Sequence, residues 1–210
     1  MKPNEENTEV EEIQEAVIVS SQSVNPMELD VTQDLLDKAG QMVKSGLLPA
    51  SVQTAQAAVA IMQYGRELNF PPMASFVNIF VVNGKPSLAT KAMAGLLYKG
   101  GVRWSVLQDY EPEFKEDGST RDYVTTIQMI RDGITNKFSF RYTDAARAEL
   151  TKRDVWIKYT KNMMYWRCFS MLADRVAPDL LLGMPDAAMM MDVTKQNYTM
   201  NEAGELSISK

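Results

Sequence analysis

The sequence predicts an α+β fold in which a small antiparallel sheet, made of two hairpins, is flanked by helices and the acidic termini are disordered. Apolar residues recur at helical spacing towards both ends of the chain. Between them lie segments rich in β-branched and aromatic residues, which favour strands. Two of these segments run into Asn83-Gly84 and Asp132-Gly133, dipeptides typical of tight hairpin turns.

The first half of the chain begins with a polar, acidic segment, 1–25, whose lack of an apolar period predicts a disordered tail. Ser51 can cap the clearer of two helices that follow, and Pro71-Pro72 ends it. An alanine-rich segment that ends at Gly100-Gly101 predicts a third helix. In order, we expect helices over 26–46 and 51–69, strands over 76–82 and 85–88, and a helix over 89–99.

The second half begins with strands and continues with helices. A polar segment, 111–121, contains Pro112 and Gly118 and is expected to be a loop. The other expected elements are strands over 102–110, 123–130 and 134–142 and helices over 143–150, 161–176 and 185–191. These three strands and the strand over 76–82 are expected to share one sheet. Residues 26–191 then form a single domain, followed by a flexible tail over 192–210.

Residue types exclude several classes of function. The 210 residues include no histidine, which excludes Ser-His-Asp and Cys-His catalysis and metal sites that need imidazole. The single cysteine, Cys168, fits a reducing compartment. The acidic N-terminus does not look like a signal peptide, and no apolar run approaches the ~20 residues of a membrane span. We therefore expect a cytoplasmic protein that is not an enzyme, with no cofactor, metal or membrane partner.

The net charge of −5 is unevenly distributed. Residues 31–185 carry 19 basic and 15 acidic side chains, a net charge of +4, between two acidic ends. Within them, 137–175 holds nine basic residues against four acidic ones. A weakly basic middle of this kind is compatible with a nucleic-acid partner.

The most informative segment, 156–167, mixes basic and aromatic residues. Proteins that bind single strands need this mixture, because cations follow the phosphates and aromatic faces stack on bases. On a helix from Lys161 onward, Trp166 and Phe169 share a continuous apolar face, which favours a core role for both rings. For Lys161 and Arg167, contact with DNA and a structural role are equally supported. The other candidates in this region are Trp156, Lys158, Tyr159 and Arg175.

Two further lysines follow the first hairpin turn. Gly84-Lys85 suggests a P-loop, but that motif requires Gly in place of Ile79 and Ser or Thr in place of Pro86. No ATP site is therefore expected. Lys85 and Lys91 remain candidates for DNA contact, and the alternative is an ordinary hairpin turn with solvated lysines.

A cluster of acidic residues suggests an alternative function, that of a metal-dependent nuclease. Asp109, Glu111, Glu113 and Lys115 resemble the core of many nucleases, where two acids hold Mg²⁺ and a lysine steadies the attacking water. Their polar, proline-containing context favours a solvated loop instead. The second alternative is a self-assembling structural phage protein, whose Met-rich and aromatic faces bind copies of itself.

Several blocks of the sequence, taken in order, resemble the RecT/Bet (Red beta-like) family of phage single-strand annealing recombinases. The central blocks are GRELNFPPM at 65–73 and IFVVNGKPS at 79–87. The later blocks are DAA at 144–146, WIKY at 156–159, MMYWR at 163–167 and APDLL at 177–181. The resemblance covers roughly 51–183, and the order and spacing of the blocks carry it.

The resemblance implies binding to single-stranded DNA and ATP-independent annealing to a duplex, in homologous recombination and DNA repair in a bacterial host cell. It also implies a homo-oligomer, as a ring or helical filament, and a partner exonuclease. In the family match, Lys161 and Arg167 stand first at DNA-contacting positions and Lys85 and Lys91 second, whereas Asn162 stands where the family often has a basic residue. The full set of candidate DNA-binding residues is Lys161, Arg167, Lys158, Lys85, Lys91, Trp156, Tyr159 and Arg175.

Overall fold

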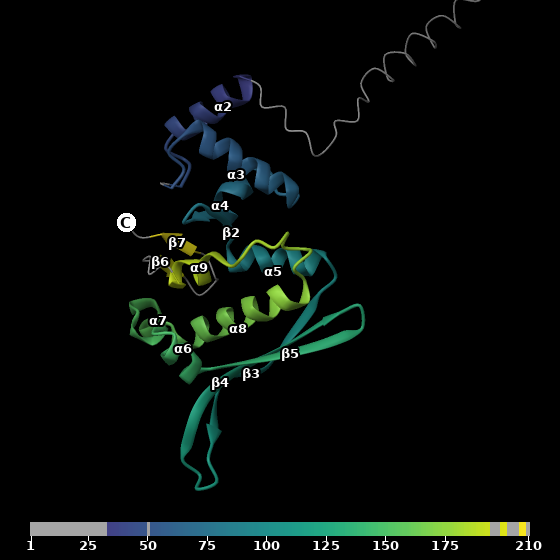
Figure 1. The fold of residues 1–210 in the computed structure, drawn as a ribbon, viewed down its shortest axis with the longest axis vertical. Coiled ribbons are helices and arrows are strands. Elements are labelled where there is room, and N and C mark those ends of the chain that lie inside the picture. The colour runs from purple at the N-terminus through teal and green to yellow at the C-terminus, as the bar shows by residue number, and fades with distance from the viewer. Residues whose placement is uncertain (1–32, 50, 194–197, 201–205, 209–210) are drawn as a thin grey trace, which may run out of the picture. The chain divides into compact units, whose positions relative to one another are not determined.

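The computed structural model describes residues 33–49, 51–193, 198–200 and 206–208 (Figure 1). The tail expected over 1–25 lies outside the described residues. The helices are α2 (Gln33–Lys44), α3 (Ala55–Glu67), α4 (Pro72–Asn78), α5 (Thr90–Lys99), α6 (Tyr142–Arg147), α7 (Asp154–Lys158), α8 (Thr160–Val176) and α9 (Ala187–Val193), with a 3₁₀ turn at Leu150–Lys152. The strands are β1 (Ile79–Val82), β2 (Lys85–Leu88), β3 (Arg103–Phe114), β4 (Thr120–Arg131), β5 (Ile134–Arg141), β6 (Tyr198–Met200) and β7 (Leu206–Ile208).

The α+β class is confirmed, and so are both predicted hairpin turns. Asn83 and Gly84 have φ angles of 50° and 74°, and Asp132 and Gly133 have 50° and 77°. A type I′ turn needs positive φ at both central residues, and Asn, Asp and Gly tolerate it best. The hairpins β1–β2 and β4–β5 therefore form where the sequence places them.

The prediction of one shared sheet is wrong. In the described residues β1 pairs only with β2, whereas β3, β4 and β5 form a separate antiparallel sheet in that order. The first strand is also shorter than expected, because 76–78 belong to α4. Pro72 occupies the start of that helix, where its fixed φ and missing N–H cost nothing. The proline pair starts α4, whereas α3 already ends at Glu67, before Asn69 turns left-handed with a φ of 57°.

The sheet β3–β4–β5 is covered on one face by α8, and α5 packs against α8 from the other side (Figure 1). Ile127 and Met129 of β4 are fully buried on the covered face, and Phe169 and Leu172 of α8 pack into the same core. None of the helices within the described ranges is long and apolar enough to span a bilayer.

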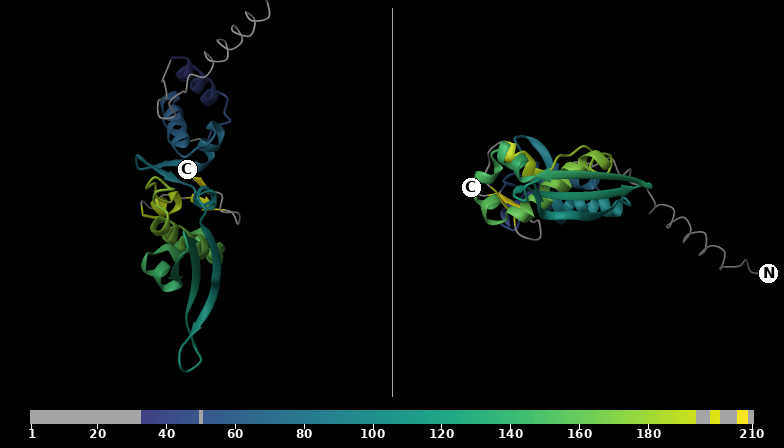
Figure 2. Two further views of the ribbon diagram at one scale, coloured as in Figure 1. Left: turned by 90° about the vertical axis from the view of Figure 1, so that its right-hand side faces the viewer. Right: turned by 90° about the horizontal axis from the view of Figure 1, so that it is seen from below.

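The hairpin β3–β4 is longer than predicted, since residues 111–114 and 120–121 are strand rather than loop. Pro112 is tolerated because β3 is an edge strand and needs no donor on its open side. The pairing of β5 ends where Arg141 faces Val124, so β3 and β4 continue alone as a two-stranded extension (Figure 2).

Two differences occur towards the end of the chain. The helix expected over 143–150 divides into α6 and the 3₁₀ turn, because Glu149 adopts a left-handed φ of 58°. The tail expected to be flexible over 192–210 begins inside α9, and its described residues pair as β6 and β7. Strands of three residues are too short to leave an alternating apolar pattern in a sequence.

Candidate nucleic-acid interface

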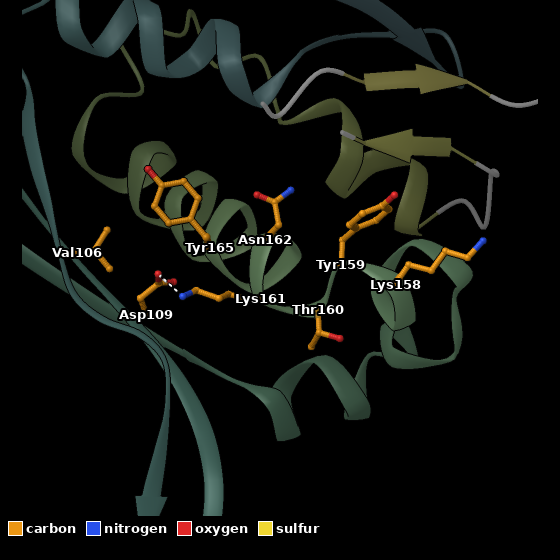
Figure 3. Close-up of a pocket in the computed structure, with 8 residues that line it drawn as sticks. All are labelled: Val106, Asp109, Lys158, Tyr159, Thr160, Lys161, Asn162 and Tyr165. Carbon is orange, nitrogen blue, oxygen red and sulfur yellow. Dashed lines mark ion pairs between the residues drawn. The ribbon is translucent and has the colours of Figure 1, made fainter. Parts of the chain in front are cut away.

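A groove lies where β3 passes the start of α8 (Figure 3). Its volume is about 470 Å³. We call it the α8 groove, and its lining residues are Val106, Asp109, Lys158, Tyr159, Thr160, Lys161, Asn162 and Tyr165. Three of the predicted DNA-binding residues, Lys158, Tyr159 and Lys161, therefore meet at one site.

The two lysines of the α8 groove are exposed and paired with carboxylates. Lys161 Nζ lies 2.9 Å from Asp109 Oδ2, and the two side chains are 62% and 45% exposed. Lys158 Nζ lies 2.7 Å from Asp154 Oδ2, and this hydrogen bond raises the pKa of Lys158. Exposed ion pairs are worth about 0–1 kcal/mol, so a phosphate can replace either carboxylate at little cost.

Two tyrosines line the same groove. Tyr159 ends α7 and is exposed. Tyr165 is half-buried, and this burial raises the pKa of its phenol. Its ring packs edge-on against Trp166, with ring centroids 4.9 Å apart, and is held by the aromatic core around Phe169. The α8 groove thus combines two exposed cations with one exposed aromatic ring and one that is anchored in the core.

Trp156 does not belong to this surface. Its side chain is only 1% exposed, and its ring packs near Phe140 in the core. A ring buried to this extent has no free face for a base, so the prediction that Trp156 stacks on DNA does not fit its position. Three consecutive apolar residues, Val155-Trp156-Ile157, show no helical period, so the sequence did not separate the buried Trp156 from the exposed Ile157.

Arg167 is also an interior residue. It is 10% exposed and forms an ion pair with Asp192 of α9, which is 2% exposed. Arg153 Nη1 contacts the same carboxylate at 2.8 Å. The Arg167 guanidinium lies 5.9 Å from the centre of the Trp156 ring. This environment favours the structural role that the sequence left open, with Asp192 as the partner.

The remaining candidates lie outside the α8 groove. Lys85 begins β2 and is exposed, and Lys91 is exposed in the first turn of α5. Arg175, in the last turn of α8, packs over Phe138 with 4.4 Å between the guanidinium carbon and the ring centre. The structure therefore does not gather these three cations with Lys158 and Lys161 around one groove.

Two of the three carboxylates considered for a nuclease are paired with a cation. Asp109 contacts Lys161, and both Glu113 carboxylate oxygens accept hydrogen bonds of 3.1 Å from Arg141. Among the residues that the structure describes, no three Cys, Asp or Glu side chains are grouped to hold a metal ion. The groove residues that the sequence analysis did not select as DNA-binding include Val106, Thr160 and Tyr165, and Asp109 was not expected as an ion-pair partner. Val106 and Asp109 belong to β3 and are brought to Lys161 by tertiary packing, which no local pattern reports, whereas Thr160 and Tyr165 are its neighbours in the chain.

Comparison with known proteins adds no relative. The sequence matches no protein-family model, no curated protein and no solved structure. A functional assignment therefore rests on the residues and the geometry of the α8 groove.

Proposed function

We propose that this chain is an ATP-independent single-stranded DNA-binding protein that anneals complementary strands. It would act in homologous recombination of the RecT/Bet type, in the cytoplasm of a bacterial host. The observation that carries the proposal is the α8 groove, where exposed Lys158 and Lys161 lie beside Tyr159 and Tyr165.

Binding in this groove would exchange one set of ion pairs for another. Phosphates displace Asp109 and Asp154 from the lysines and release the counterions that the DNA carried. The aromatic rings then stack on bases without selecting a sequence. The modest net charge of +4 over 31–185 makes each subunit a weak binder, so repeated subunits of an oligomer would supply most of the affinity.

Annealing by this route needs no covalent intermediate. The thiol that could act as a nucleophile, Cys168, is buried, and burial raises its pKa to about 11. It therefore stays protonated at neutral pH, and a protonated thiol is a poor nucleophile. The α8 groove would therefore act on DNA by electrostatic attraction to phosphates and by stacking on bases.

We expect the full chain to bind a fluorescently labelled single strand without nucleotide, and more weakly as salt rises. Fluorescence anisotropy across a salt series measures this, because each phosphate contact adds about 0.7 to the magnitude of the log–log slope for a single strand. Binding that is absent at low salt, with the chain still self-associating, would favour the structural assembly alternative. Mg²⁺-dependent shortening of the labelled strand would favour the nuclease.

A further inference from the structure

A stacked pair of tyrosines lies on the β3–β4 hairpin, close to the α8 groove. The rings of Tyr110 and Tyr123 have centroids 4.7 Å apart and planes inclined by 16°. Tyr123 is 38% exposed, although its neighbours along the strand, Asp122 and Val124, are buried. An exposed aromatic stack at the start of a two-stranded extension is not required for the core beneath α8.

A β-bulge brings these two rings together. The register of β3 against β4 shifts between Asp109 and Glu111, which leaves Tyr110 as the extra residue. Tyr110 has a φ of 58°, a left-handed conformation that is unfavourable for a bulky side chain. Its N–H donates to Thr125 Oγ1 at 3.3 Å, which holds the bulge in place. Bulges and strained residues of this kind commonly re-aim a side chain at a functional site.

The stack continues the face of the sheet that forms the α8 groove. Side chains alternate along a strand, so Tyr123 shares the face of Thr125 and Ile127, which α8 covers further along. Asp109 of the groove faces Thr125 directly, and Tyr123 lies two residues beyond, about 7 Å away at ~3.4 Å per residue. That distance is roughly two base steps of a stacked strand, at ~3.4 Å each.

The surroundings of the stack suit a nucleic-acid strand. Arg121 is exposed and lies two residues before Tyr123 in β4, where a second register shift leaves it as the extra residue. A cation therefore lies beyond the stack, towards the tip of the hairpin. Burial and then the nearby Tyr142 and Tyr123 raise the pKa of Tyr110, which keeps its phenol neutral. Lys161, the neutral aromatic stack and Arg121 therefore follow one another along the length of the hairpin.

We propose that Tyr110 and Tyr123 form a base-stacking platform that receives an unpaired nucleobase of the strand whose phosphates contact Lys158 and Lys161. The inference rests on the proposed function and adds to it a second binding element, on the hairpin rather than on α8. Tyr123 supplies the exposed ring, and Tyr110 fixes the orientation of that ring by stacking on one of its faces.

The test compares Tyr123→Ala with Tyr123→Phe, and with Tyr98→Ala as a control for an exposed tyrosine outside the groove. We expect Tyr123→Ala to weaken single-strand binding about five- to tenfold, the lower part of the range for loss of one stacked base. The log–log salt slope should stay unchanged, because stacking releases no counterions. Tyr123→Phe keeps the aromatic face and should bind like the wild type, as should Tyr98→Ala. Wild-type affinity of Tyr123→Ala, or a lowered slope, would overturn the platform.

Photocrosslinking locates the contact independently of any variant. An oligonucleotide that carries 5-iodouracil, irradiated on the wild-type chain, should attach to the peptide that contains Tyr110 or Tyr123. Attachment only to other peptides, with binding intact, would overturn the platform and leave the proposed function standing. Absence of any binding by the wild-type chain would overturn both.

Discussion

Replacing Arg167 by alanine is expected to destabilise the fold by about 3 kcal/mol, without acting directly on DNA. The guanidinium lies in the interior and pairs with Asp192, and removing one partner of a buried ion pair costs ~3–5 kcal/mol. Arg153 continues to contact Asp192 in the variant, which places the loss at the lower end of that range. For a chain of this size the midpoint of thermal unfolding should fall by on the order of 10 °C.

Lys161→Ala is the matched control, because it removes an exposed cation from the same helix and should change the free energy of unfolding by ~1 kcal/mol or less. A double variant, Arg167→Met with Asp192→Leu, removes both charges of this pair but also the carboxylate that Arg153 contacts, so it should recover only part of the lost stability. Chemical denaturation of the three variants measures these differences. A stable Arg167→Ala chain with weakened DNA binding would show instead that Arg167 reaches the strand.

The double variant Lys158→Ala with Lys161→Ala is expected to have the largest effect on DNA. Each lysine is exposed and held by one exposed carboxylate, so the fold should lose little stability. Two lost phosphate contacts should lower the log–log salt slope by about 1.4 per subunit. The same relation gives an affinity about 25-fold weaker per engaged subunit at 0.1 M salt, and the losses multiply along an oligomer.

Two further variants make this prediction specific to the groove. Lys152 is paired with Glu149 at 3.0 Å and is exposed, but it does not line the groove, so Lys152→Ala should bind like the wild type. Asp109→Asn removes the carboxylate that competes for Lys161 and should tighten binding at low salt. An equal loss from Lys152→Ala and from Lys161→Ala would show that only overall charge matters and that the groove is not the site.

Much of the fold could be predicted because its signals are local. The turns at Asn83-Gly84 and Asp132-Gly133 require positive φ, and the sequence places at those positions the residues that adopt it. The pairing of whole hairpins was not predictable in this way. Whether β1 joins β4 depends on where α5 and α8 pack, and no residue in either hairpin encodes that.

In the candidate site, too, the residues that are neighbours in the sequence could be predicted, and those whose positions depend on tertiary packing could not. Lys158, Tyr159 and Lys161 could be predicted from composition, because they are neighbours in the sequence and remain neighbours in the groove. Trp156 and Arg167 come from the same segment, yet the Trp156 ring packs in the core near Phe140, and Arg167 pairs in the interior with Asp192 of α9. The stack of Tyr110 on Tyr123 depends on a bulge, and an extra residue in one strand leaves no periodic signal.

The most direct test of the central claim is annealing itself. Two complementary oligonucleotides, one labelled with a donor and the other with an acceptor fluorophore, are mixed with the full chain without nucleotide or metal. We expect energy transfer to rise faster than in the absence of protein, to slow with salt and with the Lys158→Ala, Lys161→Ala double variant, and to leave both strands at full length. A rate equal to that of protein-free DNA, or one that requires ATP, would contradict the account.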